Sequence, residues 1–272
     1  MTLTQDLFNL NGKTAAITGG AGILCSAIAR MLAEQGANVA ILDLNAVAAE
    51  SLAAELGPNA IGIGTNVLDR ASVEAAAGQV IERFGSVDIL INGAGGNKAQ
   101  ATTGGDLTFF DLPPDAIQWV FNLNILGTII PSQVFGHRMA QQNHGAILNI
   151  SSMAADRPLT RVLAYSAAKA SVSNFTQWLA IHMAQEYTPN IRVNALAPGF
   201  FLTAQNHFLL VDEQSGELTA RGQQILTNTP SGRFGSPDDL LGAVLWLISP
   251  AASFVTGIVL PIDGGFSAYS GV

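Results

Sequence analysis

The 272-residue sequence is poor in cysteine and in charged residues, and both shortages exclude classes of protein. A single cysteine, Cys25, rules out an internal disulfide and a cysteine-based zinc site, and it is typical of a reducing compartment. Charged residues make up 12% of the chain and hydrophobic residues 49%. Disordered chains show the opposite balance, so this chain should fold. The small number of charges on so long a chain also indicates that part of its surface is buried between subunits.

Basic residues are also scarce, with 12 Lys and Arg against 20 Asp and Glu, which gives a formal net charge of −8. An acidic surface repels nucleic acid and anionic lipid, so neither is an expected partner. The first eleven residues lack a basic segment followed by an apolar one, so no secretory signal is predicted there. These features together favour a cytoplasmic protein.

A long uncharged run, from Leu240 to Ile262, has the length of a membrane span. Pro250 and Pro261 interrupt it, and short polar residues lie between them. We therefore expect a buried helix over 240–248, then a turn and a buried strand over 257–262.

Short apolar runs alternate along the chain with longer amphipathic or alanine-rich runs. The predicted strands are Thr14–Thr18, Asn38–Asp43, Ala60–Gly64, Val87–Asn92, Ala146–Ser151, Arg192–Ala195 and Ile258–Ile262. The predicted helices cover 23–35, 45–56, 70–84, 115–142, 163–187 and 237–248. This order predicts one α/β domain over 1–272, a Rossmann-type doubly wound parallel sheet with helices on both faces. The longest break in the alternation, 200–236, is predicted to be a substrate lid.

A glycine-rich turn, Thr18-Gly19-Gly20-Ala21-Gly22-Ile23-Leu24-Cys25, follows the first predicted strand and opens the first predicted helix. Such a turn lets backbone amides approach a pyrophosphate at the positive end of a helix. The dinucleotide contacts that we expect here come from Gly19, Gly20, Gly22, Ile23 and Leu24. A tight turn without a ligand is the alternative.

Asp43 ends the second predicted strand, 24 residues after Gly19. A carboxylate there can accept a hydrogen bond from a ribose 2′-OH and would repel a 2′-phosphate. Two like charges about 4 Å apart cost roughly 4 kcal/mol at an effective dielectric of about 20. We therefore predict NAD rather than NADP as the cofactor, with a helix N-cap as the alternative or additional role of Asp43.

These motifs, with others further along the chain, resemble the short-chain dehydrogenase/reductase family in type and order. The later motifs are Asn92-Gly93-Ala94-Gly95, Asn124, Ser152, Tyr165-Ser166-Ala167-Ala168-Lys169, Pro198-Gly199 and Thr203. The chain departs from the family pattern at Ile23 and Cys25, where the family has glycine, and at Gly93, where it often has asparagine. Cys25 is interpreted as a packing residue, and the effect of these departures on the pyrophosphate contacts is left open.

The resemblance implies an oxidoreductase with four catalytic residues, Asn124, Ser152, Tyr165 and Lys169. Tyr165 would be the acid/base for the substrate hydroxyl, and Lys169, four residues later on the same helical face, would lower its pKa. Ser152 would hold the substrate oxygen, with Ser151 as the alternative. The resemblance gives Asn124 a place in a proton relay, and a satisfied core amide is its alternative role.

The resemblance also extends the predicted cofactor site. Asn66 would accept a bond from the adenine amino group, Val67 would pack on the ring, and Thr203 would bind the nicotinamide carboxamide or cap a lid helix. The remaining predicted contacts are Asn92, Ala94, Gly95, Tyr165, Lys169, Pro198 and Gly199.

Segments outside the cofactor motifs are similar to the D-mannonate oxidoreductase (fructuronate reductase) branch of the family. They are 94–98 with 101–103, 157–161, 173–178, 198–203 with 205–206, and 265–272. The resemblance implies interconversion of D-mannonate and D-fructuronate in hexuronate metabolism. The substrate carboxylate calls for a basic partner, for which Arg157 and Arg161 are preferred. The other candidate substrate residues are Asn97, Lys98 and Asn206.

Two long predicted helices, 115–142 and 163–187, are unusually apolar, which indicates a subunit contact. The resemblance implies a homotetramer. Other readings stay open: a dehydrogenase for another sugar acid or polyol resembling gluconate 5-dehydrogenase, an enzyme for a steroid or 3-oxoacyl substrate, or a non-catalytic dinucleotide-binding regulator. No metal site is predicted, because the four histidines lack metal-ligand spacing.

Overall fold

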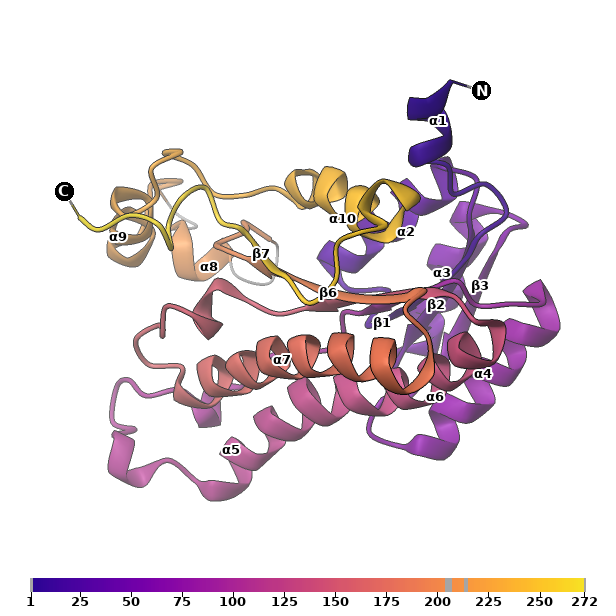
Figure 1. Cartoon of the computed structure of the whole chain (residues 1–272). Coiled ribbons are helices and arrows are strands. Elements are labelled where there is room, and N and C mark those ends of the chain that lie inside the picture. Colours follow the sequence, from indigo (N-terminus) through magenta and orange to yellow (C-terminus); the bar gives the residue numbers. More distant parts are fainter. Residues whose placement is uncertain (1, 204–206, 213–214, 272) are drawn as a thin grey trace.

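The sheet at the centre of the molecule has seven parallel strands in the order β3-β2-β1-β4-β5-β6-β7 (Figure 1). The computed structural model describes residues 2–203, 207–212 and 215–271. The strands are β1 Thr14–Thr18, β2 Asn38–Asp43, β3 Ala60–Gly64, β4 Ile89–Asn92, β5 Gly145–Ile150, β6 Ile191–Pro198 and β7 Val259–Ile262. The predicted single-domain, doubly wound α/β fold is therefore confirmed, because every strand run recognised in the sequence joins this sheet.

Four strands differ from their predicted bounds, β5 and β7 by a single residue and β4 and β6 by more. Strand β6 continues to Pro198 because both of its neighbours pair with it: Ile150 of β5 is in register with Leu196, and Ile262 of β7 with Pro198. Strand β4 begins at Ile89, two residues later than expected. The local pattern could not fix these ends, because strand length depends on the neighbouring strands.

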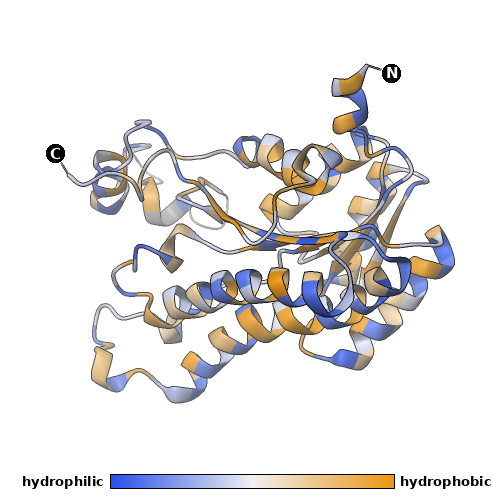
Figure 2. Ribbon diagram, in the orientation of Figure 1, coloured by the Kyte–Doolittle hydropathy of each residue, from blue (hydrophilic) through white to orange (hydrophobic). Residues whose placement is uncertain are grey.

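Helices cover both faces of the sheet (Figure 1). Apolar residues of α2 (Ile23–Glu34), α3 (Ala46–Leu56) and α10 (Leu241–Ile248) form one core cluster with one face of the strands. Residues of α4 (Arg70–Phe84), α6 (Gly127–Gln142) and α7 (Leu163–His182) form the other. Figure 2 shows the strands largely in hydrophobic colours, between helices that carry both hydrophobic and hydrophilic residues. A sheet covered in this way explains why its strands are apolar without alternation.

The structure corrects the two longest predicted helices. The 115–142 run is α5 (Pro114–Phe121), a π-helical turn (Asn122–Leu126) and then α6. The Asn124 side chain donates to the Val120 carbonyl at 2.7 Å, and Thr128 Oγ1 donates to the Asn124 carbonyl at 2.8 Å. The 163–187 run likewise ends in a π-helical turn over Met183–Tyr187. Side-chain bonds to backbone carbonyls accompany the first turn, and apolar periodicity cannot reveal them.

The described residues of the 200–236 segment lie beyond the carboxyl ends of β6 and β7, at the left of Figure 1. Its described part contains two short helices, α8 (His207–Leu210) and α9 (Ala220–Thr227). The uncharged 240–262 run divides into α10, a 3-10 turn (Pro250–Ala252) and β7 in the predicted order, but β7 is only half-buried rather than buried, because it is the edge strand of the sheet. Within the described residues, the helices are too short or too polar to cross a membrane. A short helix, α1 (Leu3–Leu7), precedes β1.

Candidate active site

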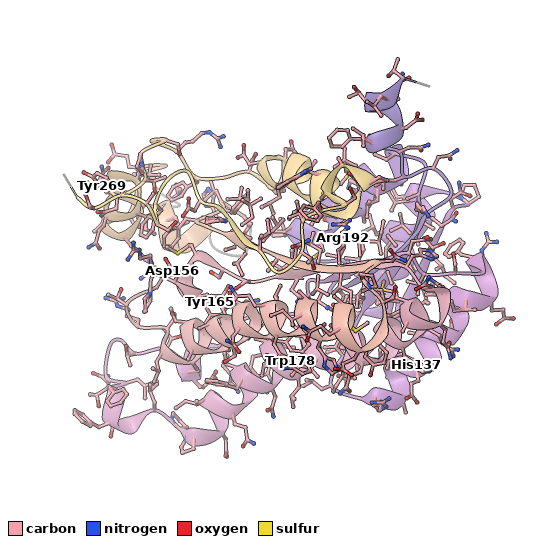
Figure 3. The ribbon with its side chains drawn as sticks, in the orientation of Figure 1. His137, Asp156, Tyr165, Trp178, Arg192 and Tyr269 are labelled. Atoms are coloured by element: carbon pink, nitrogen blue, oxygen red, sulfur yellow. The ribbon has the colours of Figure 1, made fainter. Side chains whose placement is uncertain are left out.

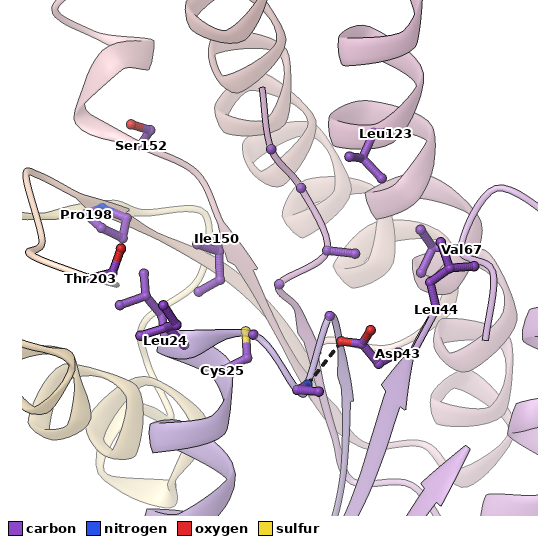
Figure 4. Close-up of a pocket in the computed structure, with 18 of the residues that line it drawn as sticks. Leu24, Cys25, Asp43, Leu44, Val67, Leu123, Ile150, Ser152, Pro198 and Thr203 are labelled. Carbon is purple, nitrogen blue, oxygen red and sulfur yellow. Dashed lines mark hydrogen bonds between the residues drawn. The ribbon is translucent and has the colours of Figure 1, made fainter. Parts of the chain in front are cut away.

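A cavity of about 850 Å³ opens at the carboxyl ends of the strands (Figure 4). Parallel α/β sheets bind ligands at this edge, where the strand order reverses. Here the reversal lies between β1 and β4, because β1 pairs with both β2 and β4. The predicted residues that line the cavity are Gly19, Gly22, Ile23, Leu24, Asp43, Asn66, Val67, Ala94, Gly95, Ser152, Tyr165, Lys169, Pro198, Gly199 and Thr203.

The glycine turn forms one wall of this cavity. Gly19 has φ +61°, and a Cβ there would lie 2.9 Å from the Cα of Ala94, so only glycine fits. Helix α2 begins at Ile23 after Gly22, which provides no side-chain cap for the first amides. These uncapped amides at a helix N-terminus suit a pyrophosphate. Gly20 packs toward β1 and β2 instead, because its Cβ would lie 2.8 Å from the Ile17 carbonyl.

Asp43 is held at the edge of the cavity by two backbone amides. Its Oδ2 accepts from Ala21 N at 3.1 Å, the dashed line in Figure 4, and its Oδ1 accepts from Asn45 N at 3.0 Å. Helix α3 is capped by Asn45, whose side chain accepts from Ala48 N at 3.1 Å. The alternative role of Asp43 as the N-cap is therefore wrong.

The predicted adenine end of the site lies after β3. Val67 lines the cavity and packs close to Gly127. The Asn66 side-chain oxygen accepts from Leu68 N at 3.0 Å, which fixes the loop. An amide oxygen has two lone pairs, so this bond leaves room for the predicted second one.

The two candidate serines at the end of β5 have different neighbours. Ser152 Oγ accepts from Ala154 N at 3.1 Å, and the Ser152 side chain interacts with the phenol of Tyr165 and lowers its pKa. Ser151 Oγ donates to the Lys169 carbonyl at 3.1 Å and pairs with Ser173 Oγ at 2.7 Å. Ser152 is therefore the serine beside the phenol, and Ser151 ties the strand end to α7.

Tyr165 and Lys169 lie on one face of α7, where Figure 3 places Tyr165 near the helix start, and both line the cavity. Lys169 Nζ is 5.7 Å from the Tyr165 ring centroid and donates to the Ile150 carbonyl at 2.7 Å. Burial lowers the pKa of the Lys169 amine to about 8.

The expected lowering of the Tyr165 pKa by Lys169 is not what the structure gives. Desolvation raises the pKa of the Tyr165 phenol, and the hydrogen bond with Ser152 offsets only part of that rise. The sequence argument considered the charges of the nearby ammonium and of the oxidised nicotinamide, and it omitted the cost of burying a phenolate, which favours the neutral phenol.

Asn124 is fully buried beneath the turn that follows β4. Its Nδ2 donates to the carbonyls of Gly96 and Val120, both at 2.7 Å, and its Oδ1 accepts from Gly96 N at 3.2 Å. A Cβ at Gly95 would lie 2.7 Å from Asn124 Oδ1 and 3.1 Å from Lys169 Nζ. Asn124 and Lys169 thus lie against the same glycine, and the Asn124 bonds also fit its alternative role as a satisfied core amide.

Asn92 lies in the buried sheet rather than on the cavity wall. Its Nδ2 donates to Ser132 Oγ at 2.9 Å and to Asn149 Oδ1 at 2.8 Å. Its buried Oδ1 has no hydrogen-bond partner among the described residues. This placement indicates a structural role at the base of the turn.

The described substrate candidates all lie away from the main cavity wall. Asn97 donates to Thr102 Oγ1 at 2.9 Å, and Arg157 Nε donates to the Ser267 carbonyl at 3.0 Å. Arg161 lines a separate hollow of about 430 Å³, and Lys98 Nζ lies 4.9 Å from the Trp119 ring centroid. Asn206 lies outside the described residues.

Some lining residues were missed from the sequence, among them Trp119, Leu123 and Phe200. Phe200 directly follows the Pro198-Gly199 motif, and this adjacency could have indicated it. Trp119 and Leu123 precede the π-helical turn or lie in it and carry no comparable signal. The described residues contain no cluster of His, Cys, Asp or Glu suited to a metal ion.

A doubly wound sheet with a glycine turn, an acidic residue after β2 and a tyrosine–lysine pair at its carboxyl edge defines a dinucleotide-dependent oxidoreductase. Residues 20–267 match a family model described as enoyl-(acyl carrier protein) reductase. The chain belongs to the short-chain dehydrogenase/reductase family and is an enzyme that acts on CH–OH groups.

Two relatives and one solved structure place the chain more closely. An uncharacterized oxidoreductase of Bacillus subtilis (strain 168), UxuB, is 50% identical over 97% of this chain and 98% of its own length. A D-threitol dehydrogenase of Mycolicibacterium smegmatis is 36% identical over 98% and 99%. A structure from Haemophilus influenzae, provisionally named a D-mannonate oxidoreductase and holding NAD, has 49% identity and a TM-score of 0.92 over 97% and 98%.

Proposed function

We propose that this enzyme interconverts D-mannonate and D-fructuronate with NAD. The observation that carries the proposal is the placement of Tyr165, Ser152 and Lys169 around one cavity whose other end is formed by the glycine turn and Asp43. The similarity to a structure named for D-mannonate supports the choice of substrate.

NAD is favoured over NADP because Asp43 keeps its carboxylate at the cavity edge, hydrogen-bonded by Ala21 and Asn45. The amides of the glycine turn would hold the pyrophosphate, and Thr203 would bind the carboxamide. When bound, the nicotinamide ring supplies or accepts the hydride. The remaining chemistry is the movement of one proton.

Tyr165 moves that proton in this mechanism. In reduction its phenol donates to the carbonyl oxygen of the substrate, and the raised pKa keeps the phenol protonated near neutral pH. In oxidation the phenolate must accept the hydroxyl proton, so this direction should speed up as the pH rises. Ser152 holds the reacting oxygen beside Tyr165, and Asn124 would bind water that links Lys169 to solvent.

The carboxylate of the sugar acid would be bound from the loop between Ser152 and Tyr165. Arg157 and Arg161 both lie on this loop, and Arg157 is tied by Nε to the C-terminal segment at Ser267. The lid over 200–236 would close on the substrate. Replacing each arginine by alanine tests the assignment: the carboxylate partner should raise the KM for D-mannonate and leave the KM for NAD unchanged.

A homotetramer is proposed because α7 and its terminal turn expose large apolar side chains. Trp178, which Figure 3 places on α7, is 54% exposed, and Ile181 and Tyr187 are exposed to a similar degree. Light scattering of the purified protein tests this assembly. A monomer or a stable dimer would contradict it.

The deciding experiment follows reduced nicotinamide by absorbance with purified enzyme, NAD or NADP, and D-mannonate. D-gluconate, simple polyols and a 3-oxoacyl thioester serve as comparisons, since a related sugar-acid, polyol or acyl substrate is the alternative. Turnover of D-mannonate with NAD well above the others is expected. An inert D-mannonate beside an active D-gluconate would replace the substrate and keep the mechanism.

A further inference from the structure

Cys25 and Gly93 come into direct contact where the two turns that line the cleft meet. Cys25 lies in the first turn of α2, and Gly93 follows β4. A Cβ built at Gly93 would lie 2.1 Å from Cys25 Sγ, far inside van der Waals contact. The thiol therefore occupies the space that any side chain at position 93 would need, and Figure 4 shows its sulfur at the cavity wall.

The φ angle of position 93 does not require glycine. Gly93 is absent from the glycines that have positive φ, so its conformation is open to other residues. Its amide donates to the Thr18 carbonyl at 3.1 Å and to Thr18 Oγ1 at 3.2 Å, and these bonds fix the turn against β1. Two atoms thus oppose a side chain here: the thiol, which overlaps the built Cβ most deeply, and the Thr18 carbonyl, 2.9 Å from it.

The position of the thiol connects it to the cofactor cleft. Cys25 lines the cavity and is only 5% exposed. Burial raises the pKa of the Cys25 thiol to about 12, so the group is neutral and acts through its size. Gly95, two residues after Gly93, lies against both Asn124 and Lys169. A displacement of the 92–95 turn would therefore be transmitted to the catalytic residues.

We propose that Cys25 and Gly93 are a size-matched pair of positioning residues: the thiol fills the space of a side chain at 93 and sets the distance between the two turns that hold the dinucleotide. The inference rests on the proposed binding of NAD in this cleft. It gives a specific role to two positions at which the chain departs from its family's pattern.

A double-mutant cycle tests the pair. Gly93→Ala adds one carbon where Sγ lies, and Cys25→Ala removes that sulfur but keeps a Cβ, which lies 3.7 Å from the new methyl group. The double variant thus moves one heavy atom from residue 25 to residue 93. We expect Gly93→Ala to weaken NAD binding by about tenfold or more, and the double variant to recover most of that loss. The Thr18 carbonyl should keep the recovery incomplete.

Two controls separate size from chemistry. Cys25→Ser keeps a γ atom, so Cys25→Ser with Gly93→Ala should bind NAD as poorly as Gly93→Ala alone. Gly78→Ala in α4, where an added Cβ meets nothing within 4 Å, controls for a glycine replacement as such. The readouts are the Kd of NAD by calorimetry, the KM of NAD against kcat, and the Tm of each variant.

The outcomes distinguish this inference from the proposed function. If the wild-type enzyme binds no NAD, the proposed function fails. Coupling between positions 25 and 93 that is then seen only in Tm would show that the two residues pack together without a cofactor role. That result would overturn the positioning role. If the wild type binds NAD, a double variant no better than Gly93→Ala in NAD affinity or folding overturns the pair. An insoluble Gly93→Ala beside a soluble, NAD-binding double variant supports it.

Discussion

The two edges of the same parallel sheet bury ionisable groups in opposite ways. At the carboxyl edge, Lys169 is buried with a backbone carbonyl as its hydrogen-bond partner, and its pKa is lowered. At the amino edge, Asp88 accepts from Lys13 Nζ at 2.9 Å, from Thr14 N at 2.9 Å and from Ser86 Oγ at 3.3 Å, and it pairs with His144 Nε2 at 3.0 Å. The carboxyl edge thus leaves the ammonium charge of Lys169 with few hydrogen-bond partners. The amino edge surrounds the carboxylate of Asp88 with hydrogen-bond donors.

This difference agrees with the carboxyl edge as the candidate functional edge. Desolvation would raise the pKa of Asp88, but the hydrogen bonds from Thr14, Lys13 and His144 outweigh it and lower the pKa. Asp88 thereby ties the starts of β1, β4 and β5 together. Lys169 has no such set of partners, so its burial costs stability. A costly buried charge in a cleft marks a functional site.

The largest difference between the two edges is expected on substitution of Tyr165, at the carboxyl edge. Tyr165→Phe removes the phenolic proton and leaves the ring, so we expect kcat to fall by about 10²- to 10⁴-fold with little change in Tm. Steady-state kinetics and calorimetry on the same preparation measure both. A variant that keeps most of its rate would mean that another group moves the proton.

Lys169→Met tests whether the buried ammonium of Lys169 lowers the stability of the folded protein. A pKa lowered on folding means that the unfolded chain holds the proton more tightly, so the wild type should gain stability as the pH rises from about 8 toward 10.5. At pH 7 the methionine variant should be inactive. Its free energy of unfolding should equal that of the wild type or exceed it by up to about 3 kcal/mol.

Urea denaturation across this pH range measures the effect of Lys169→Met. The orphaned Ile150 carbonyl offsets part of the gain. A wild-type stability that falls between pH 8 and 10, corrected with the methionine variant, would contradict this account of the edge.

Asp88→Asn tests the opposite edge. The variant loses the charge-assisted bonds and should be less stable by about 1–3 kcal/mol at pH 7, while kcat stays near the wild-type value. Because the folded pKa of Asp88 is lowered, its contribution is complete above the unfolded pKa of about 3.9 and is lost as the pH falls through the folded value. The gap between the two proteins should therefore close in acid, as denaturant midpoints at pH 7 and pH 3 would reveal.

Asp43→Ser, at the carboxyl edge, should have the smallest effect of the four substitutions, a change in the preference for NAD over NADP. Removing the carboxylate removes its repulsion of a 2′-phosphate, so the preference for NAD over NADP should drop by about tenfold. The ratio of kcat/KM for the two cofactors measures it. Asp69→Ser is a suitable control because Asp69 caps α4 outside the cavity lining. An unchanged ratio would place the discrimination elsewhere in the cleft.

Much of the fold could be read from local pattern, and the site only in part. The glycine turn, Asp43 and Ser152 could be recognised because each lies at a strand end or within a few residues of one, and parallel strands bring those ends together. The Tyr165–Lys169 pair could be recognised because residues four apart share one face of a helix. The π-helical turn at Asn124, the raised pKa of Tyr165 and the wall position of Trp119 could not. They depend on side-chain bonds, desolvation and packing between segments distant in sequence.

The order of apolar runs alone determined the sheet, its two helical layers and the edge at which polar residues gather, since burial on both faces requires that pattern. The tertiary structure decided which groups face each other across the edge. Cys25 and Gly93 are 68 positions apart, and neither explains the other until β1 and β4 pair and bring the thiol into the space that glycine leaves. Exclusion of one atom by another is a property of distance in space, which a linear sequence does not record.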